Sequence, residues 1–128
     1  MARLSQICVV AIAAVALHAP VNAAVTWCSP RVTYVTLTPS GVLYPGFEGM
    51  GTPLLCNING DVAVPGIGTV TADVCKAWYA SLTTALATQK TVTMGFDFGA
   101  SAAPACNAFP VFSWALPNPY PFFMQFDR

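Results

Sequence analysis

Residues 71–90 read TADVCKAWYASLTTALATQK, and this stretch decides the class of fold. Apolar residues recur every four positions along it, at Val74, Trp78, Leu82 and Leu86, and polar residues lie between them. This spacing is the period of an amphipathic helix, whereas the segments on either side alternate with a period of two. The sequence therefore predicts a single helix in a chain that is otherwise made of strands.

Segments rich in β-branched and aromatic residues flank this helix on both sides, and proline and glycine at their ends indicate turns. The five expected strands are 25–38, 42–47, 52–58, 91–98 and 109–116. Residues 59–70 are rich in glycine but lack the lysine and the spacing of a phosphate-binding P-loop. We expect them to form a plain connecting loop.

Five short strands with a helix between the third and the fourth is the order of an OB-like Greek-key barrel. Closing the sheet removes its exposed edges, and the helix covers one end of the barrel. A ferredoxin-like order would need a second helix, and an immunoglobulin-like sandwich would need about two more strands. The sequence predicts one mainly β domain, residues 24–128, whose residues 117–128 form a tail rich in proline and aromatic residues.

The first 23 residues have the three-part order of a secretory signal peptide. Arg3 precedes an apolar run from Ile7 to Leu17, and small residues end the segment at Ala23. A membrane-spanning helix needs about 20 apolar residues, so this run is too short to be an anchor. We expect cleavage after Ala23, no integral membrane span in the mature chain, and a secreted or periplasmic location.

The composition excludes several classes of function. The only histidine, His18, lies in the predicted signal peptide, so a Ser-His-Asp or Cys-His mechanism has no base in the mature chain. Four cations against five carboxylates in the mature chain are too few for binding nucleic acid. We expect no enzyme, no cofactor and no nucleic-acid partner. A glycosidase built on Asp61 with Asp73, or on Glu48 with Asp97, is a weak alternative.

Four cysteines remain after the predicted cleavage, an even number typical of a disulfide framework in an exported chain. The wide gaps between them do not suit a zinc site, so we expect no metal. In an OB-like barrel the third strand ends near the start of the helix, and the end of the fourth strand lies beside the start of the first. Of the three pairings that four cysteines permit, we therefore expect Cys56–Cys75 and Cys28–Cys106.

Several parts of the sequence resemble a broad group of small exported bacterial proteins. The matching residues are Gly41-Val42-Leu43-Tyr44, Gly46, Gly49, Cys56, Cys75-Lys76-Ala77-Trp78-Tyr79-Ala80-Ser81-Leu82, Ala85 and Lys90-Thr91-Val92. The fold of that group is similar to the B subunits of the pertussis and subtilase type of toxins, which are OB-like barrels that form pentameric rings and bind glycans. The resemblance implies an OB-like fold. No glycan-contacting motif of those subunits matches particular positions here, and the chain after Leu116 departs from the group.

Aromatic residues crowd the last twenty positions, which is more apolar area than a monomer readily leaves exposed. Prolines fix much of the backbone there and so reduce the entropy lost on docking. The tail is expected to dock on its own barrel or on another chain. The candidate interface residues are Trp114, Tyr120, Phe122, Phe123 and Phe126.

The sequence as a whole favours an exported binding or assembly module without catalysis. Its expected partner is a protein or a second copy of the chain, and a glycan is a second candidate because aromatic rings with a polar handle suit binding surfaces. A structural envelope protein and an inhibitor of a secreted enzyme are the alternatives.

Overall fold

The computed structural model describes residues 24–99, 101–109 and 111–126, and the predicted signal peptide, residues 1–23, lies outside this range. The described part is mainly β with one α-helix, α1 (Ala72–Thr88), and a short 3-10 helix, η1 (Cys106–Ala108). Its strands are β1 (Val25–Cys28), β2 (Val32–Leu37), β3 (Val42–Phe47), β4 (Gly51–Thr52), β5 (Cys56–Asn57), β6 (Val62–Val64), β7 (Gly68–Val70), β8 (Val92–Asp97), β9 (Phe112–Ser113) and β10 (Pro121–Phe126).

Helix α1 forms where the four-residue period predicts it. Thr71 is its N-cap, and its hydroxyl accepts a hydrogen bond from the amide of Val74 at 3.4 Å. The carboxylate of Asp61 accepts a second one from the amide of Ala72 at 3.0 Å. The helix ends at Gln89, which adopts a left-handed conformation with φ of 56°.

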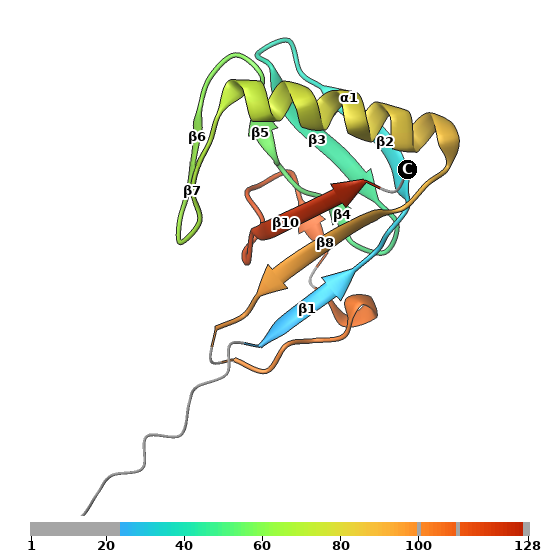
Figure 1. The fold of residues 1–128 in the computed structure, drawn as a ribbon, viewed down its shortest axis with the longest axis vertical. Helices are drawn as coiled ribbons and strands as arrows, with labels where there is room; N and C mark the ends of the chain where they lie inside the picture. Colours follow the sequence, from blue (N-terminus) through green and yellow to red (C-terminus); the bar gives the residue numbers. More distant parts are fainter. Residues whose placement is uncertain (1–23, 100, 110, 127–128) are drawn as a thin grey trace, which may run out of the picture.

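The strands form three separate groups. In the first sheet β8 lies between β1 and β10, and both pairs are antiparallel. The second sheet has the order β2-β3-β4-β9, with β5 paired to β3 and β9 parallel to β4. Strands β6 and β7 form a two-stranded hairpin. Figure 1 shows α1 across the top of the molecule, the hairpin at its side and the β1–β8–β10 sheet below it.

The structure corrects the predicted barrel. No closed barrel forms among the described residues, because no ladder joins β10 to the sheet that contains β2 and β3. The helix follows the seventh strand rather than lying between the third and the fourth, since several predicted strands are divided into shorter ones. Closure depends on pairing between distant strands, which local periodicity does not determine.

The predicted strand 25–38 is two strands in two sheets. The chain turns a corner at Ser29-Pro30, where proline has no amide to donate to a ladder. The carbonyl of Pro30 instead accepts a hydrogen bond from the amide of Val92 at 3.0 Å. This corner links the first sheet to the second.

Three other segments differ from the expectation. The predicted loop 59–70 contains the β6–β7 hairpin, whose turn places Gly66 and Gly68 at φ of 78° and 122°. The predicted strand 52–58 retains only the short β4 and β5, and the predicted strand 109–116 only β9. The tail forms a strand, β10, which pairs with β8 from Pro121↔Phe96 to Phe126↔Val92, and the register of this pairing shifts between Pro121 and Phe123.

The core lies between α1 and the two sheets and is closed by two disulfides. Its largest fully buried side chains include Phe96, Leu43, Leu55 and Leu82. Disulfide bonds join Cys28 to Cys106 and Cys56 to Cys75, each with a Cα–Cα distance of 5.6 Å, and these are the two pairs expected from the sequence. The first bond ties β1 to η1, and the second ties β5 to α1.

Candidate functional site

The outer side of the β1–β8–β10 sheet carries three exposed aromatic rings. Residues of β8 alternate, so that Val92, Met94 and Phe96 point into the core while Gly95 lies on the opposite side. The register places Trp27 of β1 and Phe123 of β10 directly beside Gly95, one on each flank. Two aromatic side chains from the ends of the described chain therefore meet across a glycine.

Trp27 packs against two of the three phenylalanines of the tail, Phe122 and Phe123. Its ring centroid lies 5.6 Å from that of Phe122 and 5.3 Å from that of Phe123, and both pairs are edge-to-face with interplanar angles of 74°. This is the arrangement that the charge distribution of aromatic rings favours. The cluster has a defined geometry although its rings are 39–53% exposed.

Gly95 makes this packing sterically feasible. A β-carbon at this position would lie 2.8 Å from Cζ3 of Trp27 and 2.9 Å from Cζ of Phe122. Both distances are shorter than ordinary van der Waals contact, so a side chain here would push the rings away from the sheet. The glycine is buried because the rings cover it.

The apolar surface extends beyond the three rings. A hollow of about 150 Å³ opens beside Phe122 and Phe123 and is also lined by Ile67 of the hairpin and Val74 of α1. These two side chains are exposed, as is Val25, which precedes Trp27 by two positions on the same side of β1. We call the surface formed by these residues the aromatic face; its members are Val25, Trp27, Ile67, Val74, Phe122 and Phe123.

A polar row borders the aromatic face. Thr93 and Gln125 lie opposite each other in the ladder, on the same side of the sheet as Gly95 and Phe123. The hydroxyl groups of Ser29 and Thr93 are hydrogen-bonded at 2.9 Å. The face thus has an apolar centre and hydrogen-bonding groups along one border.

The structure places the five residues predicted as an interface, Trp114 and four residues of the tail, in separate parts of the molecule. Phe122 and Phe123 belong to the aromatic face. Tyr120 is buried, its hydroxyl donates to the carbonyl of Leu55, and burial raises its pKa well above the usual range of a tyrosine. Trp114 is exposed and packs on Tyr44 of β3, with ring centroids 5.0 Å apart.

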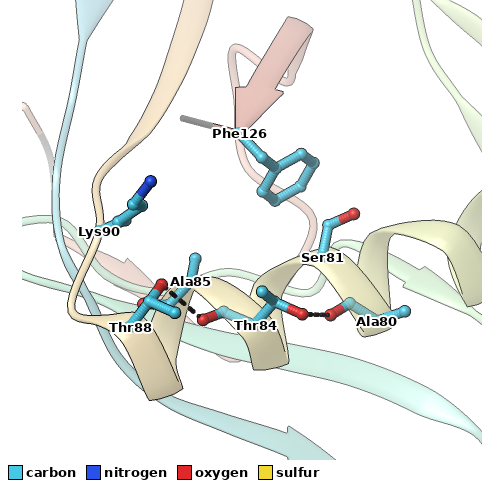
Figure 2. A pocket seen from close by; sticks show the side chains of 7 residues that line it. All are labelled: Ala80, Ser81, Thr84, Ala85, Thr88, Lys90 and Phe126. Carbon is cyan, nitrogen blue, oxygen red and sulfur yellow. Dashed lines mark hydrogen bonds between the residues drawn. The ribbon is translucent and has the colours of Figure 1, made fainter. Parts of the chain in front are cut away.

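The fifth residue, Phe126, lines a shallow hollow of about 370 Å³ beside α1. Figure 2 shows its ring and the Lys90 side chain on either side of this hollow. The hydroxyls of Thr84 and Thr88 donate to the helix carbonyls of Ala80 and Thr84, at 3.0 and 2.8 Å. The two threonine hydroxyls are thus engaged within the helix, and Ser81 and Lys90 supply the other polar groups of the lining.

Three of the four carboxylates considered for glycoside cleavage make contacts with neighbouring groups, and the fourth, Glu48, lines a hollow beside Cys28 and Cys106. Asp61 caps α1, and Asp73 forms an exposed ion pair with Lys76 at 3.1 Å. The carboxylate of Asp97 accepts a hydrogen bond from the amide of Gly99 at 2.7 Å.

Sequence reasoning counted Trp27 among the aromatic residues that could stack on a sugar ring but did not place it beside the tail, and it missed Gly95. Gly95 gave a usable signal, because a glycine inside a predicted strand often marks close approach of another group. The packing of Trp27 on the tail gave no signal in the sequence, because it depends on β1 and β10 both pairing with β8.

Within residues 24–99, 101–109 and 111–126, no cluster of three or more His, Cys, Asp or Glu side chains is placed to hold a metal ion. The helices of this part of the chain are too short or too polar to cross a membrane. Comparisons with protein-family models, with curated proteins and with solved structures gave no match.

Proposed function

We propose that this chain is an exported, non-catalytic binding or assembly module that contacts its partner through the aromatic face. The observation that carries the proposal is the cluster of Trp27, Phe122 and Phe123, ordered by mutual edge-to-face packing yet exposed to solvent. Exposed apolar surface of this extent is typical of interaction sites, and tryptophan is among the residues that contribute most to binding.

The covalent framework supports an extracytoplasmic role. Two disulfides persist in oxidising compartments, and both here anchor the elements around the core. Strand β1, which carries Trp27, is fixed at its end by the bond between Cys28 and Cys106. A rigid surface loses little entropy when it binds, which favours recognition by a preformed face.

A glycan is the second candidate ligand, and the polar row favours it. Ser29, Thr93 and Gln125 offer hydroxyl and amide groups beside aromatic rings, the combination that sugar rings require. Titration with oligosaccharides, followed by tryptophan fluorescence, tests this candidate. Saturable quenching that is lost in Trp27→Phe, but not in Trp114→Phe, supports a glycan ligand.

The main proposal is tested by photocrosslinking in the cells that produce the protein. Trp27 is replaced by p-benzoylphenylalanine, which keeps a large aromatic ring on the face and reacts with any neighbour under ultraviolet light. We expect one discrete covalent adduct, detected by its mass. Tyr79, an exposed aromatic residue on α1 away from the face, provides the matched control position.

Two outcomes contradict the proposal. If position 27 gives no adduct, the aromatic face has no partner and the binding function fails. If position 114 gives an adduct and position 27 does not, the contact lies on the surface formed by Trp114 and Tyr44 instead.

A further inference from the structure

We infer that the aromatic face joins two copies of this chain in a two-fold symmetric dimer. The inference rests on the proposed binding function and names its partner. In such a contact the same surface is used by both copies, so that residue i of one copy meets residue j of the other and the reverse holds.

The first argument is area. Weighted by their exposed fractions, the six side chains of the aromatic face offer about 450 Å² of apolar surface. A standard interface buries about 800 Å² on each partner, and 56–65% of this, about 450–520 Å², is apolar. The face therefore supplies the apolar area of one side of a standard dimer.

The second argument is charge. The six members of the aromatic face are uncharged, so two copies of the face meet without repulsion between like charges. Two carboxylates border the face: Asp97 stands in the ladder opposite Val25 and accepts a hydrogen bond from the amide of Gly99, and Asp73, next to Val74, is paired with Lys76. The centre of the aromatic face has no charged side chain that would favour a partner of opposite charge. An apolar centre is typical of contacts between identical chains.

The third argument is shape. Trp27 is the most exposed ring of the face, at 53%, and stands on β1 at one side of the sheet. The hollow lined by Ile67, Val74, Phe122 and Phe123 lies at the other side, beyond β10. A two-fold axis through the middle of the face brings Trp27 of each copy toward the hollow of the other. We place the exposed surface of the indole of one copy against the hollow of the second, while the ring stays packed on Phe122 and Phe123 of its own chain.

Sedimentation velocity on the purified full chain measures the association. We expect a monomer–dimer equilibrium with a Kd of about 1–100 µM, since the contact is of standard size and without strong polar anchors. Trp27→Ser and Phe123→Ser should each weaken dimerisation at least about tenfold. Tyr79→Ser, an exposed aromatic control outside the face, should leave the Kd unchanged.

Two further measurements keep the test valid if a variant does not fold. The melting temperature of the unaltered chain should rise with its concentration, because a second copy stabilises the folded state by mass action. In addition, crosslinking from position 27 in a mixture of ¹⁵N-labelled and unlabelled chains should give hybrid dimers. The expected crosslinked peptides from the second copy contain Val74 or Phe123.

The outcomes separate the dimer from the general binding function. A monomer at every concentration, with no hybrid adduct, overturns the dimer. If position 27 then still crosslinks to another molecule in cells, the binding function stands and its partner is not a second copy. If no adduct forms in either setting, both proposals fail.

Discussion

The two sides of the β1–β8–β10 sheet carry aromatic clusters of similar size but opposite exposure. On the inner side Phe96 packs against Phe109 and Phe112, with ring centroids 4.6 and 6.2 Å apart, and all three rings are buried. On the outer side Trp27 packs against Phe122 and Phe123, and all three rings are exposed. The comparison suggests that the inner cluster stabilises the fold and the outer cluster serves recognition.

The largest expected effect comes from the bond that connects the two clusters. The disulfide between Cys28 and Cys106 joins the strand of Trp27 to the segment that leads to Phe109. Its removal by Cys28→Ala with Cys106→Ala should lower the free energy of unfolding by about 4.5 kcal/mol in the loop-entropy model. The bond between Cys56 and Cys75 closes a shorter loop, so its removal by Cys56→Ala with Cys75→Ala should cost about 3 kcal/mol.

Urea denaturation of the two double variants measures this difference. The Cys28/Cys106 variant should also lose the order of the outer rings, seen as a weaker near-ultraviolet circular dichroism signal of Trp27. Equal losses of stability in both variants would show that chain entropy is not what separates the two bonds.

The next largest effect is the contrast between one ring of each cluster. Phe96→Ala removes a fully buried ring and should cost about 3–5 kcal/mol, through lost burial and a cavity. Phe123→Ala removes an exposed ring and should cost less than about 1 kcal/mol while weakening association. Denaturation and sedimentation of the two variants check the contrast. Similar losses of stability from both would mean that the outer cluster is part of the core.

The inner side of this sheet was largely predictable from the sequence, whereas on the outer side only Phe122 and Phe123 were named in advance, as part of the tail. In the strand 91–98 the apolar residues Val92, Met94 and Phe96 alternate with others and are the ones buried, and the four-residue period predicts α1 to within a few residues. Both patterns are local and follow from burial of one side of each element. The outer side of the sheet is not required to be buried, so no periodic pattern in the sequence marks the residues that form the aromatic face.

Pairing between distant strands limited the prediction. The corner at Pro30 divides what appeared to be one long strand, and β10 forms in a segment interpreted as an extended tail. Each change depends on which strand lies next to β8, a property that arises from the whole chain. The cysteines were the exception, since their pairs agree with the expectation although no closed barrel forms among the described residues.

A smaller effect is expected at Tyr120, which precedes the outer rings but points into the protein. Tyr120→Phe leaves the buried carbonyl of Leu55 without its donor and should cost about 1–2 kcal/mol. Because burial raises the pKa of Tyr120, the folded chain keeps the phenol neutral where the unfolded chain ionises it. Below about pH 10 the phenol is neutral in both states and the full stability is present. As the pH rises above this value, ionisation of the unfolded chain lowers the free energy of unfolding.

Denaturation at pH 8 and at pH 11 therefore tests Tyr120 in two ways. The unaltered chain should lose more stability between these values than Tyr120→Phe does. Tyr34→Phe, which removes the hydroxyl that pairs with Thr52, is the control for loss of a tyrosine hydroxyl elsewhere in the fold. An identical alkaline loss in the unaltered chain and in Tyr120→Phe would contradict the assignment.

The smallest expected effect on stability, and the most informative about the outer cluster, is that of Gly95→Ala. Gly95 has an ordinary backbone conformation, so alanine introduces no backbone strain, and the atoms it meets are the far ends of Trp27 and Phe122. These ends can move outward, so the free energy of unfolding should change by less than about 1 kcal/mol. The rings should then lose their edge-to-face packing, and dimerisation should weaken by about tenfold. Gly60→Ala is the matched control, because a β-carbon there meets nothing within 4 Å. A chain that keeps the Trp27 signal and the dimer after Gly95→Ala would show that the glycine does not organise the face.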